Sequence, residues 1–234
     1  NKAHSVSYGR VAYITAYLKA NYPTEYMTAV LTAEAGDLDG VAVSIKECRR
    51  MGITILPPSI NESFGTFTVI PDYSDDEETI KKYGQKKDAI RFGLFSIKNL
   101  GVGIAQSIID NRKIGGDFKT IEDFLERIQD RALNRKSLES LIKAGAMDDL
   151  GDRIELLENI DRYLEHNKAN AKKDTAQGSL FDMFAVADGQ TQTLQAHTKP
   201  VQRPEAAQQR LAWEKELLGF YISGHPLDKY KHIL

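Results

Sequence analysis

Apolar residues recur at helical spacing along most of the chain, with one interruption that is typical of strands. Residues 1–51 predict three helices. Pro23 can begin the second of them in its first turn, and Gly52 suits the end of the third. Three short segments alternate as half-buried strands do, at residues 53–56, 67–70 and 89–92. The pattern therefore predicts a mainly α fold with a small β insertion (α+β), in which the short strands pair antiparallel.

A helical unit then occurs twice. In the first copy, a Gly-Val-Gly sequence at 101–103, here called the first hairpin turn, precedes a helix with an apolar face. In the second copy, a helix over 134–143 leads into the second hairpin turn at 144–146 and a returning helix over 152–164. An amphipathic helix over 118–128 joins the two. Together they predict a tandem helix-hairpin-helix, which grips both strands of a duplex across the minor groove.

Between residues 166 and 204 the apolar period disappears, and Gln, Ala, Thr, Asp and Lys dominate. Such a composition buries too little apolar surface to order itself, so we expect a flexible linker. One dense apolar island, at residues 177–184, lies within it. A helical pattern returns over 205–218.

The overall charge limits what the chain can bind. Its 31 basic and 33 acidic residues give a formal charge of −2, which argues against a protein that coats polyanions, so any DNA contact must be local. The one cysteine, Cys48, shares a helical face with Val41 and Ile45 and is interpreted as a core residue. Five histidines with one cysteine offer no zinc spacing, and no metal site is expected. With neither a membrane-length apolar run nor a signal peptide, we expect a cytoplasmic protein without a membrane partner.

The first hairpin turn is the strongest candidate site. Gly101 and Gly103, with Val102 between them, would let backbone amides reach an outside surface at a helix N-terminus, where an anion is favoured. Lys98 adds a positive charge just before the turn. We predict that these residues bind duplex phosphates without reading sequence. On these residues alone an ordinary turn is the commoner explanation.

The second hairpin turn repeats this arrangement in a weaker form. Lys143 and Gly145 are the candidate DNA-binding residues there. The turn lacks a full Gly-x-Gly, which makes its phosphate contact the weaker prediction.

Several motifs in order resemble those of one family, the alpha (polymerase) subunit of bacterial replicative DNA polymerase III. The similar segments are 1–8 (Asn-Lys-Ala-His-Ser-Val-Ser-Tyr), 47–53 (Glu-Cys-Arg-Arg-Met-Gly-Ile), 91–103 and 214–227. The resemblance covers nearly the whole chain. It implies an internal piece that runs from the fingers through the clamp-binding region.

The resemblance implies four parts. They are the end of the fingers with a small β region (1–88), a tandem helix-hairpin-helix duplex-binding domain (89–165), a linker with a clamp-binding peptide (166–204), and a helix and connector toward a missing oligonucleotide-binding fold (205–234). The implied activity of the whole protein is template-directed addition of deoxynucleotides to a primer 3′ end. Implied partners are primer-template DNA, dNTP, the sliding clamp and other replicase holoenzyme subunits.

The implied chemistry uses Mg²⁺ held by palm carboxylates, which in this family lie upstream of this segment. We therefore expect no catalytic residue here and no activity of the fragment alone. Asp37 and Asp39 imitate a metal-binding pair, but flanking Gly36 and Gly40 favour a loop and a helix cap.

Two further sites follow from the resemblance. Lys2 and His4 lie where the family's fingers approach the incoming nucleotide, although a local hydrogen bond of a helix-start histidine explains His4 equally well. Gln177, Leu180 and Phe181 resemble a clamp-binding peptide, in which one amide and two apolar anchors enter a pocket.

The register of this peptide stays open, because Met183 and Phe184 offer a second frame. A cluster that docks back on its own domain is the alternative.

Two other functions are alternatives to the interpretation as part of a polymerase. One is a free-standing helix-hairpin-helix DNA-binding or repair module without polymerase activity. The other is an interaction scaffold that binds no DNA.

Overall fold

The structure, a computed structural model, describes residues 2–71, 88–129, 133–165, 204–224 and 226–227. Helices dominate these ranges and one small sheet accompanies them, which confirms the predicted fold class. The clamp-binding residues Gln177, Leu180 and Phe181 lie outside the described residues, as does the second frame. No helix in the described ranges is long and apolar enough to cross a membrane.

Three helices open the chain, as the apolar pattern predicts. They are α1 (Lys2–Asn21), α2 (Pro23–Ala33) and α3 (Leu38–Arg50). The side chain of Asp37 caps α3 by accepting hydrogen bonds from the backbone amides of Asp39 and Gly40, both at 3.2 Å. After α3, Gly52 has a φ of +73°, a conformation that favours glycine. The helix cap predicted at Asp37 is thus confirmed. Helices α2 and α3 pack together through their buried apolar faces.

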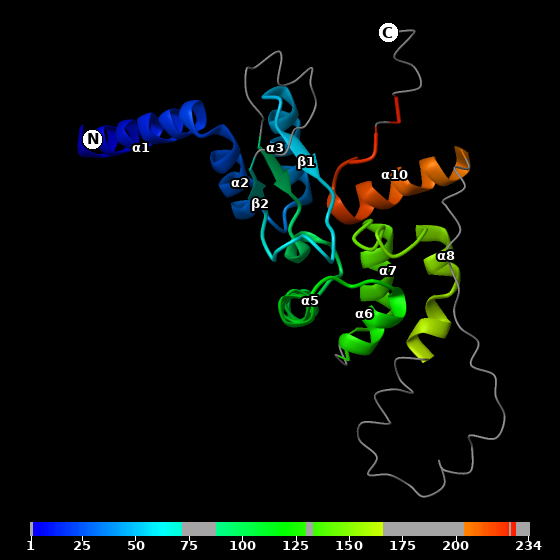
Figure 1. The fold of residues 1–234 in the computed structure, drawn as a ribbon. Helices are drawn as coiled ribbons and strands as arrows, with labels where there is room; N and C mark the ends of the chain where they lie inside the picture. The colour runs from blue at the N-terminus through cyan, green and yellow to red at the C-terminus, as the bar shows by residue number, and fades with distance from the viewer. Residues whose placement is uncertain (1, 72–87, 130–132, 166–203, 225, 228–234) are drawn as a thin grey trace, which may run out of the picture.

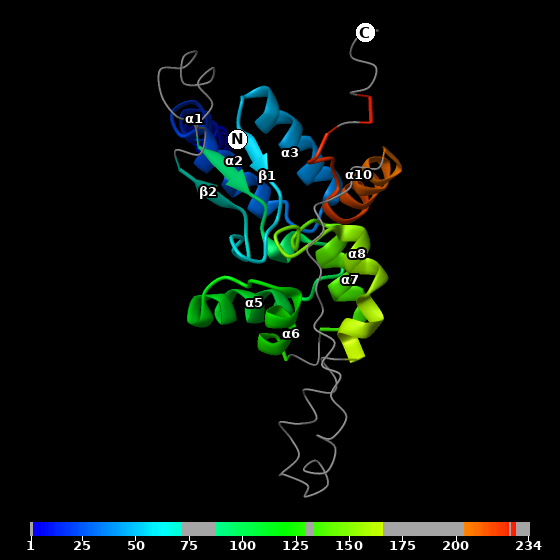
Figure 2. The same cartoon turned by 45° about the vertical axis from the view of Figure 1, so that its right-hand side comes forward.

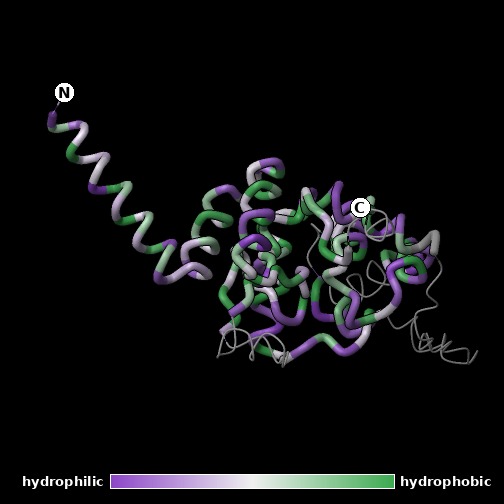
Figure 3. The backbone as a smooth tube through the Cα atoms, turned by 90° about the horizontal axis from the view of Figure 1, so that it is seen from above, coloured by the Kyte–Doolittle hydropathy of each residue, from purple (hydrophilic) through white to green (hydrophobic). Residues whose placement is uncertain are grey.

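Helix α1 differs from the other two because none of its residues is buried. It projects from the rest of the molecule, packs against α2, and is joined to α3 by the ion pair Lys19–Glu47 at 2.8 Å (Figures 1 and 3). Several of its large apolar side chains are exposed, among them Tyr13 at 72% and Val6 at 66%.

A three-stranded sheet follows, with β1 (Thr54–Leu56), β2 (Thr68–Ile70) and β3 (Ala89–Arg91). The strand order is β1-β3-β2. The last strand is central: β3 runs antiparallel to β2, as predicted, but parallel to β1, so the sheet is mixed. The domain boundary predicted between residues 88 and 89 stays a prediction. Strand β3 follows this boundary and pairs with β1 and β2, which both precede it.

The remaining elements carry the two hairpin units. They are η1 (Leu94–Ser96), α5 (Val102–Gly115), α6 (Ile121–Arg127), α7 (Arg135–Lys143), α8 (Arg153–Glu158) and α10 (Pro204–Leu218). The returning helix expected over 152–164 is interrupted by a turn at Asn159 before residues 160–165 become helical again.

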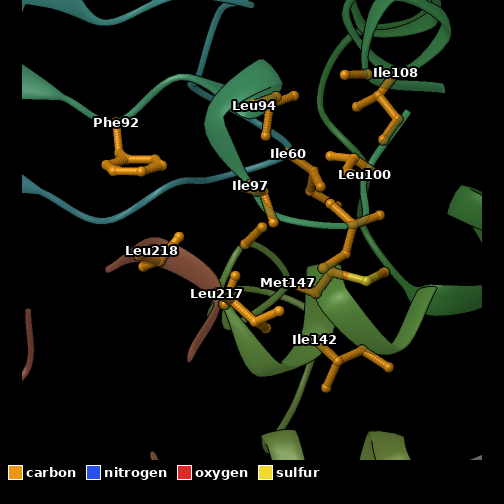
Figure 4. Close-up of a cluster of buried hydrophobic side chains, with 14 of the residues drawn as sticks. Ile60, Phe92, Leu94, Ile97, Leu100, Ile108, Ile142, Met147, Leu217 and Leu218 are labelled. Atoms are coloured by element: carbon orange, nitrogen blue, oxygen red, sulfur yellow. The ribbon is translucent and has the colours of Figure 1, made fainter. Parts of the chain in front are cut away.

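Helix α10 lies across α7 and α8 and ends beside α3 (Figure 2). One continuous apolar core runs through the described elements and includes residues of each of them except α1 and β2. Figure 4 shows its centre, where Leu217 and Leu218 of α10 meet Ile97 and Met147.

Candidate nucleic-acid interface

The segment that precedes the first hairpin turn, residues 97–100, buries its apolar side chains and exposes its polar ones. Ile97 and Leu100 are 2% and 6% exposed, whereas Lys98 and Asn99 between them face solvent. Asn99 has a φ of +66°, the only positive value at a non-glycine residue in the described ranges. Asparagine tolerates this conformation better than most residues. The two anchors therefore fix the loop while its tip turns outward.

Gly101, Val102 and Gly103 are all exposed, and Val102 retains 60% of its accessible surface. A Cβ atom added at Gly101 or Gly103 would meet nothing within 4 Å. Packing within the chain therefore does not require these glycines. What their lack of a side chain provides is an unobstructed approach to the backbone from outside.

The N-terminus of α5 also has amides available to a ligand. The first amides of a helix have no acceptor within the helix, and in four other helices a side chain supplies one. Those capping residues are Asp37, Thr120, Asn134 and Asp152. In α5 the N-cap is Gly101, and no side chain caps it. An anion at this point would satisfy amides that the chain leaves open.

Lys98 supplies the positive charge beside these amides. Its side chain is exposed, and no acidic side chain in the described ranges pairs with it. The two cations at the other end of α5 are engaged: Lys113 pairs with Asp110 at 3.6 Å, and Arg112 points inward. Arg112 donates to the carbonyl oxygens of Ile60 and Ser63 at 2.7 and 2.9 Å, and burial lowers the pKa of its guanidinium. Lys98 is thus the cation that a phosphate at the turn would meet.

The second hairpin turn has the opposite character. Gly145 is buried, and its φ of +82° is why glycine is needed there. A Cβ atom at this position would lie 2.2 Å from Nη2 of Arg153, so a guanidinium of the chain itself covers the turn. The expectation of a second turn that faces outward is therefore wrong.

Lys143, the cation of the second turn, is also occupied. Its ammonium group pairs with Glu139 at 2.6 Å and lies 5.8 Å from the centre of the Trp213 ring of α10. The amides that open α8 are capped by Asp152, which accepts from Ile154 at 2.9 Å. DNA binding by Lys143 and Gly145 stays a prediction that this geometry does not support.

The predicted nucleotide-binding residues lie on the projecting helix α1. Lys2 and His4 are exposed, and the His4 ring is 4.3 Å from that of Tyr8, a local contact within the helix. The first hairpin turn lies elsewhere in the molecule, on the side of α5 (Figure 1). Nucleotide binding by this pair stays a prediction.

The described residues offer no ligand set for the Mg²⁺ that the resemblance implies. They contain no group of three or more His, Cys, Asp or Glu side chains that could hold a metal ion. Asp37, one of the two aspartates that imitate a pair, caps α3. Cys48 is buried, as predicted for a core residue, and burial raises the pKa of its thiol to about 12. We therefore derive no metal-dependent step in this chain.

Two features of the interface are missing from the sequence prediction. The left-handed Asn99 could have been suspected, because asparagine tolerates the left-handed conformation and is common in turns. The buried pair of Arg153 and Glu214 could not, because each sits in a helical pattern as an ordinary charged residue and only tertiary contact joins them.

Comparison with known proteins finds a matching motif family and several relatives. The helix-hairpin-helix motif family matches residues 52–156. A DNA polymerase III subunit alpha from Campylobacter jejuni is 38% identical over 98% of this chain. The proteins of the same name from Deinococcus radiodurans and Mycobacterium tuberculosis are 38% and 40% identical over 99% and 100% of it. The chain spans only 18%, 16% and 18% of the lengths of these three relatives.

Proposed function

We propose that this chain, which is related over nearly its whole length to DNA polymerase III alpha subunits and contains a helix-hairpin-helix motif, is a duplex-holding part of a replicative DNA polymerase. The observation that carries the proposal is the first hairpin turn. There, uncapped helix amides and two unobstructed glycines coincide on the surface with Lys98, which pairs with no acidic side chain of the described residues.

These groups suit one ligand class. A backbone phosphate accepts hydrogen bonds from the open amides, is favoured by the positive end of the α5 dipole, and meets the Lys98 ammonium group. Phosphates are the same whatever the bases, so the turn binds duplex DNA without sequence preference. One site of this kind also agrees with the near-neutral charge of the chain.

The remaining activities belong to the proposal for the whole protein. They are primer extension with dNTP and Mg²⁺, tethering to a sliding clamp through Gln177, Leu180 and Phe181, and nucleotide contact by Lys2 and His4. The support for them is the relatedness to alpha subunits and the peptide sequence itself.

The test is a titration of the 234-residue chain against two duplexes of equal length and unrelated sequence. Wild type binds both equally, and Lys98→Glu weakens both by about tenfold, because a repulsive charge replaces a phosphate contact. Lys46→Glu, which makes the same charge change at an exposed position on α3, is the control and retains nearly full affinity. Equal binding by wild type and Lys98→Glu would refute the proposal.

A further inference from the structure

The end of α10 is bonded directly to the loop that carries the first hairpin turn. The backbone amide of Lys98 donates to the carbonyl oxygen of Leu217 at 3.1 Å. Leu217 is 2% exposed, and its side chain lies in the core cluster beside Ile97 (Figure 4). The position of the loop therefore depends on where α10 ends.

The same helix is joined to the second hairpin unit by a buried polar cluster, here called the Arg153 cluster (Asp148, Arg153, Glu214 and Ser223). The side chains of Arg153 and Glu214 are 6% and 1% exposed, with 3.4 Å between Nη1 and Oε1. Both guanidinium edges are used: Nε and Nη2 donate to the Asp148 carboxylate at 2.7 Å, and Nη1 also donates to the carbonyl oxygen of Lys143 at 3.2 Å.

Glu214 has its own set of donors on the segment that follows α10. It accepts from the backbone amides of Ile222 and Ser223 at 2.8 and 3.0 Å, and from the Ser223 hydroxyl. Burial lowers the pKa of Arg153, but its hydrogen bonds and charge interactions with Asp148 and the charge of Glu214 outweigh this and leave the pKa raised. Arg153 is thus held charged, and the buried cluster depends on every donor and acceptor staying in place.

The segment after α10 then reaches the first part of the chain. Gly219 has a φ of +87°, and a Cβ atom there would lie 2.8 Å from the carbonyl oxygen of Leu38. The ring of Phe220 lies 5.7 Å from that of Phe92, and Arg49 donates to the carbonyl oxygen of Tyr221. The segment from Glu214 to Ser223 therefore contacts α3, the strand region and both hairpin units.

We propose that the Arg153 cluster sets the orientation of the second hairpin unit relative to the first hairpin turn, which makes Arg153 and Glu214 positioning residues for duplex binding. Neither group is exposed to touch a phosphate. The expected effect on DNA binding rests on the proposed function. The orientation of the second hairpin unit is a property of the protein without DNA.

The orientation is measured without DNA. Spin labels are placed on the 234-residue chain with Gln106→Cys in α5 and Glu158→Cys in α8, both exposed, while buried Cys48 stays unlabelled. Glu214→Gln removes one charge of the cluster and broadens or shifts the distance distribution. Glu216→Gln, the same change at an exposed position of the same helix, leaves the distribution as in wild type.

Duplex titration of the unlabelled variants gives the second readout, taken well below each melting temperature. Glu214→Gln weakens binding about fivefold to tenfold while the slope of affinity against salt is unchanged, because no phosphate contact is lost. Should Glu214→Gln fail to fold, Ser223→Ala removes a single hydrogen bond of the cluster and is expected to act in the same direction.

Unchanged distances in the folded variants would overturn the inference, whatever the affinity. Changed distances with unchanged affinity would overturn the positioning role. If Lys98→Glu has no effect on binding, the proposed function fails on its own, and the distance measurement still decides whether the cluster sets the orientation.

Discussion

Individual glycines in this chain have different physical roles, although they look alike in the sequence. Gly145 and Gly219 have positive φ values and have chain atoms against them, so packing and backbone conformation demand them. Gly101 and Gly103 have neither constraint. In the first hairpin turn the fold therefore does not require the absence of a side chain, and under our proposal that absence serves an external contact.

Gly103→Ala separates these two roles. Gly103 lies inside the first turn of α5 with open space around its Cα, so alanine should stabilise the chain by about 0.5–1 kcal/mol. The same methyl group should obstruct the phosphate and weaken duplex binding about tenfold. Thermal unfolding and titration on one preparation check both. A variant that is less stable, or that binds as wild type does, would contradict this view of the turn.

At the same scale, Glu47 links α1 to α3 and responds to pH. Hydrogen bonds from Arg50 and Lys19 lower the pKa of its carboxyl from 4.5 to about 2. A lowered folded-state pKa contributes stability that is present above pH 4.5 and is lost as the pH falls toward 2. Urea unfolding of wild type and Glu47→Gln should differ at pH 7 and converge near pH 2. A difference that persists at the lowest pH would show that charge is not its cause.

At the scale of elements, the sequence predicts most boundaries because local signals agree with the tertiary result. Pro23 begins α2, Asp37 caps α3, Thr120 caps α6, and the helix of the first hairpin unit buries its predicted apolar face. The strand order was not predictable, since three short strands carry no signal of which one becomes central. The burial of the second hairpin turn was equally hidden, because it depends on the side chain of Arg153, which lies against Gly145 and pairs with Glu214 of the distant α10.

Helix α1 has little packing against the rest of the chain, and unfolding experiments can test this. Its apolar side chains stay exposed, so truncating one removes almost no buried surface. Tyr13→Ala should change the free energy of unfolding by less than about 0.5 kcal/mol. Leu31→Ala, in the fully buried face of α2, should cost about 2–5 kcal/mol. Denaturant unfolding followed by circular dichroism compares them, and similar losses would mean that α1 packs against the body in solution.

At the scale of the whole molecule, the two hairpin units differ in what they expose. The first leaves helix amides, glycines and a lysine open, while the second has its turn filled by Arg153 and is bonded to α10. The sequence predicts a second, weaker phosphate contact, because spacing shows the repeat but not which copy is covered. Among the described residues, the structure gives one open hairpin turn and one covered hairpin turn.

The most direct test of this account is the salt dependence of duplex binding by wild type and by the double variant Lys98→Glu, Gly101→Ala. Affinity falls with salt in proportion to the number of phosphate contacts. The account predicts weaker binding by the double variant, with a slope of log affinity against log salt that is shallower by about 1. Equal affinity with an unchanged slope would contradict it.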